Sequence, residues 1–276
     1  MRRVVRFDKT NMPLWIGMVM LITLILVTSL GPHFVTYDPL KVNMGERLEP
    51  VSEKHLLGTD QYGRDILSRM VHGAKYSLIV GVVSIGISTL LGSSFGIVAG
   101  YYSNTKFAGL IVWIADIAMA FPTIIIGVII AMLFGPGLEN TIMAIAVGFS
   151  PRFLRLARGV MLSIKEENYV VAARSLGMTD LRLFWAHLIP NVVSPIIIMA
   201  TIWTSDAISL EVALSFLGLG VPPPTPSWGT ILQDNLQFIT IRPFSVIWPC
   251  IAVAWAIQSL NLIGDRFRDI LDPKMR

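Results

Sequence analysis

Six long apolar runs limit this chain to very few folds. Each run holds roughly 20 mostly apolar residues, the length that a helix needs to cross the hydrocarbon core of a bilayer. A single spanning segment satisfies its own backbone hydrogen bonds only as a helix. The sequence therefore predicts an all-α integral membrane protein with six transmembrane helices, over Leu14–Phe34, Tyr76–Tyr101, Leu110–Phe134, Thr141–Leu156, Val192–Leu214 and Phe244–Gly264.

The composition agrees with a membrane location and argues against other classes. Only 14% of the residues are charged, whereas soluble domains carry about 25%. The net charge is +4, but the positive residues lie near the ends of apolar runs, so they do not form a nucleic-acid-binding patch. The one cysteine, Cys250, lies inside an apolar run. A single thiol excludes a disulfide framework and a cysteine-based metal site.

The distribution of Lys and Arg predicts the orientation of the spans. With the N-terminus in the cytoplasm, 15 of these residues fall on the cytoplasmic side and seven on the outer side. An excess of Lys and Arg is typical of cytoplasmic loops. We therefore expect both termini in the cytoplasm, with a cytoplasmic N-terminal segment over residues 1–13 and a single transmembrane domain over residues 14–276.

Two segments are expected on the extracytoplasmic side. The first covers about residues 35–75, where Asp60 is a plausible N-cap of an amphipathic helix on the outer membrane surface. The second covers about residues 218–243 and contains three consecutive prolines, which cannot extend a helix. This loop lies either outside the membrane or folded back against the helix bundle, because irregular backbone is not exposed to lipid.

A polar segment separates the fourth and fifth apolar runs, within residues 158–191. The stretch Tyr169–Asn191 carries Arg174, Asp180 and Arg182 and is predicted to form a short helix, a turn at Gly177 and a second helix. A polar helix-turn-helix between two spans is a place where a partner outside the membrane can move the helices inside it.

Motifs for covalent chemistry are missing. The sequence has no G-x-x-x-x-G-K-[ST] loop for nucleotide phosphates and no G-x-S-x-G or H-E-x-x-H motif. The histidines lack Cys or carboxylate partners at metal-ligand spacing. We therefore expect neither an enzyme nor a cofactor or metal site in this chain.

Three acidic residues lie inside apolar runs, namely Asp116, Asp206 and Glu211. Each costs about 2.5–3.5 kcal/mol at the centre of a bilayer on insertion scales, so their presence needs a reason. One interpretation is a cation or substrate-amine site in a translocation pathway. The other is a satisfied polar contact between helices.

The polar segment resembles the EAA loop of permease subunits of bacterial ABC importers. That pattern is Glu-Ala-Ala, three residues, Gly, nine residues and Ile-x-Leu-Pro. Val171 replaces the Glu and His187 stands where Ile is usual. The matching positions are Ala172, Ala173, Gly177, Ile189 and Pro190.

Three further segments resemble the peptide/nickel branch of these permeases, and within it the C-type subunit of dipeptide and oligopeptide importers. They read HLLGTDQYGRDILSRMVHGAKYSL, SFLGLGVPPPTPSWGTILQDN and LNLIGDRFRDILDPKMR. With the EAA-like loop, they extend the resemblance over nearly the whole chain.

The resemblance implies a multi-pass permease of the bacterial cytoplasmic (inner) membrane that forms half of a translocation pathway for di- and oligopeptides. Its implied partners are a second homologous permease subunit, two cytoplasmic ATP-binding subunits that hold ATP and magnesium, an extracytoplasmic substrate-binding protein and membrane lipid. Nickel or a metallophore complex is the alternative substrate. A self-contained secondary transporter or channel is the alternative from another class, but its expected repeats and intramembrane charges are weak here.

The resemblance also implies roles for particular residues. The polar segment is expected to form a coupling helix between the fourth and fifth spans that docks on an ATPase. The outer segment is a candidate contact for the binding protein, through Asp60, Arg64 and Asp65. The candidate ATPase-coupling residues are Ala172, Ala173, Arg174, Gly177, Arg182, Ile189 and Pro190.

Overall fold

The structure is a computed structural model that describes residues 11–271, and within this range it consists of helices and their connections, without a β-sheet. This confirms the predicted all-α class. Residues 1–10 of the predicted N-terminal segment lie outside the described residues. The long helices are α1 (Met12–Phe34), α2 (Ile66–Tyr101), α3 (Lys106–Met119), α4 (Thr123–Phe134), α5 (Leu138–Lys165), α8 (Ile189–Phe216) and α10 (Phe244–Leu271). The short elements are η2 (Met44–Glu46), α6 (Asn168–Ser175), α7 (Asp180–Leu183), a π-helical turn (Phe184–Leu188), α9 (Trp228–Asn235) and η4 (Leu236–Phe238).

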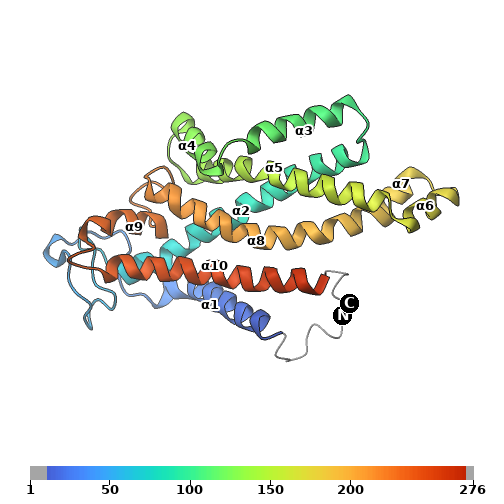
Figure 1. Ribbon diagram of the computed structural model, residues 1–276. Helices are drawn as coiled ribbons and strands as arrows, with labels where there is room; N and C mark the ends of the chain where they lie inside the picture. The colour runs from blue at the N-terminus through green and yellow to red at the C-terminus, as the bar shows by residue number, and fades with distance from the viewer. Residues whose placement is uncertain (1–10, 272–276) are drawn as a thin grey trace.

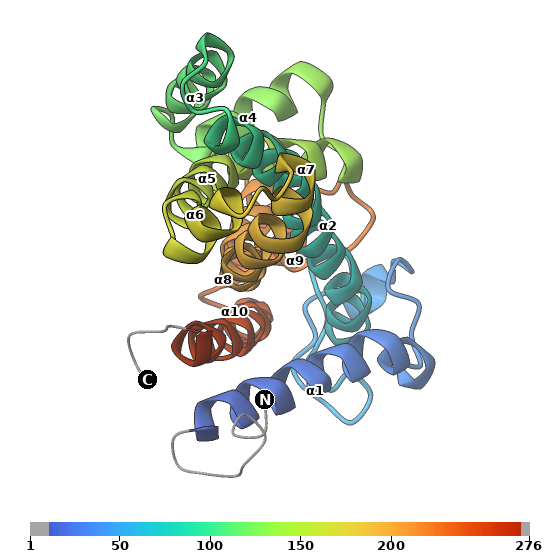
Figure 2. The same cartoon turned by 90° about the vertical axis from the view of Figure 1, so that its right-hand side faces the viewer.

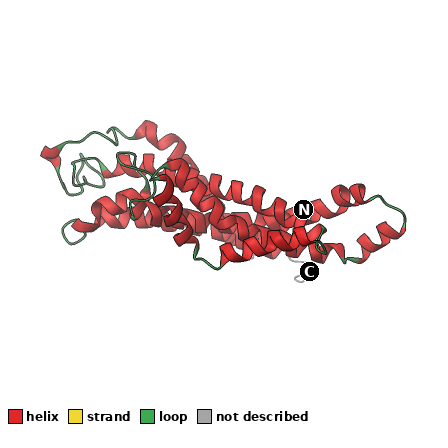
Figure 3. Cartoon of the chain, turned by 90° about the horizontal axis from the view of Figure 1, so that it is seen from above, coloured by secondary structure: helices red, strands yellow, loops and turns green. Residues whose placement is uncertain are grey.

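The long helices form an elongated bundle (Figure 1). Helices α2, α5 and α8 run through its centre, α3 and α4 cover one side, and α1 and α10 lie together on the other (Figure 2). The short helices α6 and α7 lie at one end of the bundle and α9 at the opposite end. Long loops gather at that opposite end, and a view from above shows mostly helices along the rest of the bundle (Figure 3).

The predicted set of six spans is confirmed only in part. Four helical stretches are long and apolar enough to cross a membrane, and the α3–α4 pair makes a fifth if it counts as one bent span. The two helices meet at 89°, so the prediction of one continuous helix over Leu110–Phe134 was wrong. The bend lies at Ala120–Pro122, where the proline lacks the N–H that a continuing helix would use.

Close contact between α2 and α5 forms the centre of the bundle. A Cβ atom on Gly92 would lie 2.2 Å from the Ser150 carbonyl oxygen, and one on Gly96 would lie 2.3 Å from that of Leu154. Small residues at this spacing let two membrane helices approach backbone to backbone. The Ser88 hydroxyl, one turn earlier, donates a hydrogen bond to the Ala146 carbonyl at 2.9 Å.

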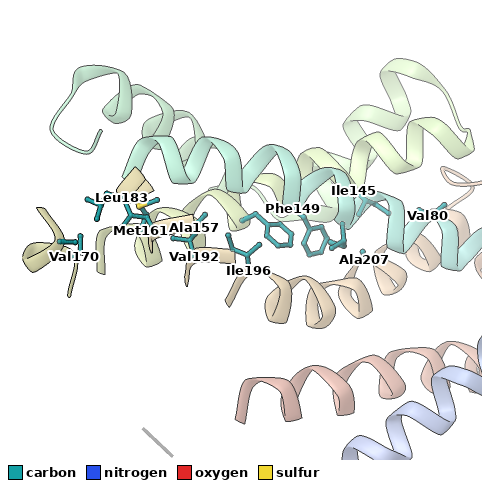
Figure 4. Packing of buried hydrophobic residues seen from close by; sticks show 14 of the residues in the cluster. Val80, Ile145, Phe149, Ala157, Met161, Val170, Leu183, Val192, Ile196 and Ala207 are labelled. Carbon is teal, nitrogen blue, oxygen red and sulfur yellow. The ribbon is translucent and has the colours of Figure 1, made fainter. Parts of the chain in front are cut away.

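A hydrophobic core extends from this contact to the far end of the bundle. It begins around Val80 and Ile145, continues through Phe149 and Met161, and ends at Val170 of α6 (Figure 4). Buried side chains in such a core are closely packed and transmit displacement. The short helices α6 and α7 are therefore attached to the spans through continuous packing.

At the end of the bundle that carries α9, helix α2 begins at a different residue from the one predicted. The expected surface helix is the first part of α2, and Asp65, not Asp60, is its N-cap, because its carboxylate accepts a hydrogen bond from the Ser68 N–H at 2.7 Å. The proline-rich loop is folded back against the bundle. Its Trp228 is buried, and the indole N–H donates to the Met70 carbonyl at 3.2 Å.

Candidate functional site

The segment α6–α7 with the π-helical turn, residues 168–188, is called the coupling segment here. Its turn requires glycine: Gly177 has φ +80°, in the left-handed region that side chains disfavour. The Met178 N–H bonds to the Ala173 carbonyl at 3.1 Å and the Gly177 N–H to that of Arg174 at 3.0 Å. These two bonds close the end of α6 as a Schellman-type cap. The sequence prediction of a turn at this glycine is confirmed.

One face of the coupling segment belongs to the core. Val170, Ala173, Leu183 and Leu188 are buried and contribute to the main hydrophobic cluster. The Phe184 ring packs edge-to-face on that of Tyr101 at 5.4 Å, which links this segment to the end of α2. The coupling segment is therefore packed against α2, α5 and α8.

The opposite face projects apolar side chains away from the bundle. Leu176, at the turn, is 89% exposed and Leu181 is 72% exposed. Neither leucine is among the residues predicted from the motif, although an apolar residue in a polar turn is a sequence signal for such a surface. Among the predicted coupling residues, Arg174 and Arg182 are exposed at the same tip, and Arg174 lies 3.7 Å from Asp180.

The end of the motif lies where the coupling segment enters α8. Ile189 is half-buried and Pro190 is exposed, directly after the π-helical turn. The Ile189 N–H bonds to the Phe184 carbonyl, as a π-helical turn requires. Proline at the next position has no N–H to donate. The π-helical turn also lies near α6, because the ring of His187 is 6.3 Å from that of Tyr169. Burial raises the pKa of the Tyr169 hydroxyl.

At the other end of the bundle, the structure brings together a group of charges that we call the Asp60 cluster: Asp60, Arg64, Arg69 and Asp234. Arg64 contacts Asp60 at 2.6 Å and Asp234 of α9 at 2.7 Å. Arg69 contacts Asp234 at 3.2 Å. The cluster therefore ties the segment before α2 to the folded-back loop. The sequence did not predict that Arg69 and Asp234 pair, because pairing across more than 160 residues of chain leaves no local pattern.

The three residues expected to meet a binding protein, Asp60, Arg64 and Asp65, are all buried. Asp65 contacts the His55 ring nitrogen at 2.8 Å, and His55 in turn contacts Glu46 at 3.2 Å. A hydrogen bond from Lys54 holds the pKa of Glu46 below its usual value. The carboxylates and the guanidinium are thus occupied within the chain, and a contact between this segment and a binding protein stays a prediction.

The three acids in the apolar runs occupy different environments. Asp116 pairs with Arg155 at 3.1 Å and Asp206 with Arg152 at 3.9 Å, and both pairs are partly exposed. Glu211 is fully buried and accepts a hydrogen bond from the Ser215 hydroxyl at 2.7 Å. This bond lies within α8, so Glu211 has a local hydrogen-bond partner in the interior of the bundle, and of the three acids only the other two lie on a surface. Within residues 11–271, no cluster of three or more His, Cys, Asp or Glu offers a metal site.

Comparison with known proteins places this geometry in a family. Residues 92–276 match the family described as "Binding-protein-dependent transport system inner membrane component". The dipeptide transport system permease protein DppC of Alkalihalophilus pseudofirmus is 38% identical over 97% of this chain and 88% of the relative. The oligopeptide transport system permease protein OppC of Bacillus subtilis is 33% identical over 97% of this chain and 88% of the relative.

Solved structures show the same fold. The MetNI methionine ABC transporter in an inward-facing conformation matches with a TM-score of 0.61 at 20% identity, over 73% of this chain and 96% of the matched chain. The family match covers the coupling segment and all of α5, α8 and α10. The chain therefore belongs to the binding-protein-dependent transport system inner membrane component family and is a multi-pass permease subunit of an ABC importer.

Proposed function

We propose that this permease subunit imports di- and oligopeptides and forms half of their translocation pathway. The relatives named above are permeases of dipeptide and oligopeptide systems, and a third, from Pseudomonas aeruginosa, is named for di/tripeptides and is 38% identical over 94% of this chain. These names favour peptides over nickel or a metallophore complex. Membership of an importer family argues against a self-contained channel.

One observation carries the mechanism: the exposed leucines at the tip of the coupling segment sit on a base that is packed into the core. Leu176 and Leu181 are available to an apolar groove on a partner, while Leu183 is fully buried behind them. Closure of an ATPase pair would displace the docked tip. The packed base would then convert that displacement into rigid-body motion of α5 and α8.

The partners follow from the same role. A second homologous permease completes the pathway, two cytoplasmic ATP-binding subunits hold ATP and magnesium, and an extracytoplasmic binding protein delivers the peptide.

In this arrangement both termini lie in the cytoplasm, with six membrane segments. Residues 14–276 act as one permease domain, segments 35–75 and 218–243 face outward, and the coupling segment faces the ATPase.

Reconstitution tests this proposal. Proteoliposomes that contain this chain, the second permease and the ATPases should accumulate a labelled dipeptide only with ATP and the binding protein present. An excess of unlabelled dipeptide should compete, whereas nickel should not. Uptake of nickel without uptake of peptide would refute the substrate, and uptake without the ATPases would refute the importer mechanism.

A further inference from the structure

Two partly exposed ion pairs lie on the surface of the helix bundle. Arg155 Nε lies 3.1 Å from Asp116 Oδ1 and links α5 to α3. Arg152 Nη1 lies 3.9 Å from Asp206 Oδ2 and links α5 to α8. The four side chains are between 37% and 56% exposed. Charged side chains that are this exposed do not contribute to the packing of the core, so their presence needs another explanation.

The acid of each pair lies on a stretch that is apolar enough to span a membrane, Asp116 on the bent α3–α4 pair and Asp206 on α8. Ser150, two residues before Arg152, and Leu154, directly before Arg155, contact Gly92 and Gly96 of the apolar span α2. Asp206 lies inside another stretch apolar enough to span, Asp180–Phe216. A charged side chain exposed to lipid there costs about 2.5–3.5 kcal/mol on insertion scales. This surface must therefore face water or protein in the assembled transporter.

A second observation points to the same place. The break between α3 and α4 lies beside Arg152, whose Nη2 donates a hydrogen bond to Thr123 Oγ1 at 3.0 Å, at the first residue of α4. The guanidinium also lies 4.7 Å from the centre of the Phe149 ring. Irregular backbone at membrane depth occurs where it lines a cavity or is covered by protein, and broken helices form the substrate sites of many transporters.

We propose that Asp116, Arg152, Arg155 and Asp206 form a charged site in the wall of the translocation pathway that binds the ammonium and carboxylate groups of a peptide in transit. Arg152 and Arg155 are three residues apart on α5, so they lie on one face of that helix. Each arginine can donate two hydrogen bonds to a carboxylate, and each aspartate can accept from an ammonium. This inference rests on the function proposed above.

The weakness of the two pairs suits such a role. A partly exposed ion pair contributes only about 0–1 kcal/mol to stability. A zwitterionic peptide can therefore break the pair at small cost, so that its carboxylate binds the arginine and its ammonium binds the aspartate. A transport site must bind strongly enough to accept its ligand and weakly enough to release it. Glu211 does not belong to this site, because its carboxylate is buried and hydrogen-bonded to Ser215.

Accessibility of introduced cysteines tests whether water reaches the site. In the complete transporter with Cys250→Ser, we expect Asp116→Cys and Asp206→Cys to react with a charged, water-soluble methanethiosulfonate and a transported dipeptide to slow the reaction. Leu90→Cys is the control, because Leu90 is exposed on an apolar part of α2. Failure of both cysteines to react, at rest and during turnover, would overturn the proposal.

Substrate charge tests whether the site binds peptide. We expect Asp206→Asn to lower the ratio of lysine-containing to aspartate-containing dipeptide uptake about ten-fold, as for the loss of one charge-assisted hydrogen bond, and Asp206→Glu to restore it. A purely structural role would lower both uptakes equally, and an unchanged ratio would refute the site. A wild-type complex that imports neither dipeptide would instead refute the proposed function.

Discussion

Both ends of the bundle carry Arg and Asp side chains, yet they use them in opposite ways. In the Asp60 cluster, the Arg64 and Asp60 side chains are 6% and 0% exposed. In the coupling segment, those of Arg174 and Asp180 are 55% and 74% exposed. The first set holds the chain to itself. The second leaves its charges and the neighbouring leucines exposed on the surface of the molecule.

Burial explains why this difference matters. Removal of one partner from a buried charge pair leaves the other charge without compensation, whereas an exposed pair exchanges its partner for water. The Asp60 cluster also joins distant parts of the chain, α9 and the start of α2. The two ends should therefore respond very differently to the same type of substitution.

The largest effect is expected from Asp60→Asn. The carboxylate accepts from the backbone N–H groups of Tyr62 and Arg64 as well as from the Arg64 side chain. Its neutralisation leaves two buried guanidinium groups with Asp234 as the one charged carboxylate of the cluster. We expect a loss of about 3–5 kcal/mol in stability, seen as earlier thermal unfolding in detergent. Asp180→Asn is the matched control and should unfold like the wild type. Equal shifts for both variants would remove the contrast between the two ends.

A smaller effect on stability, but a large one on transport, is expected from Gly177→Val. A β-branched residue at φ +80° is strained by about 1–2 kcal/mol, so the turn should change shape and displace the docking tip. ATP-driven uptake in proteoliposomes should fall while ATP hydrolysis becomes uncoupled from it. Asparagine tolerates this conformation better, so Gly177→Asn should retain most uptake. Normal uptake by the valine variant would contradict the coupling role.

The exposed leucines should affect binding without affecting stability. If Leu176 is buried against an ATPase, Leu176→Ser should cost about 1.5–3 kcal/mol of docking energy, or at least ten-fold in affinity measured between permease complex and ATPase. Leu176→Met keeps the apolar surface and should bind almost normally. Unchanged binding of the serine variant would show that the tip does not dock through this side chain.

The smallest effect is expected from Arg174→Gln. The pair with Asp180 is long and exposed, so its loss should change the unfolding free energy by no more than about 1 kcal/mol. Thermal unfolding of this variant beside Arg64→Gln provides the direct comparison. A larger shift for Arg174→Gln than for Arg64→Gln would show that the coupling end is held by its charges after all.

Local patterns predicted the parts of the structure that depend on neighbouring residues. The apolar runs predicted most of the spanning helices, and Gly177 predicted the turn of the coupling segment, because both features follow from backbone chemistry within a few residues. The break between α3 and α4 was not predicted, since the apolar run continues through Pro122 without interruption. The N-cap was placed at Asp60 because an aspartate before an apolar helix has the same local pattern at residue 60 as at residue 65.

The sequence by itself determined that this chain is helical, lies in a membrane and carries a polar coupling segment, since hydropathy and turn chemistry are local properties. Only the tertiary structure decided which charges serve what purpose. It buried Asp60 and Glu211, left Asp116 and Asp206 partly open beside arginines, and exposed Leu176 at a tip. These outcomes depend on how helices far apart in sequence pack together, and a charged residue has the same local pattern whether its partner is an arginine, a serine, water or another subunit.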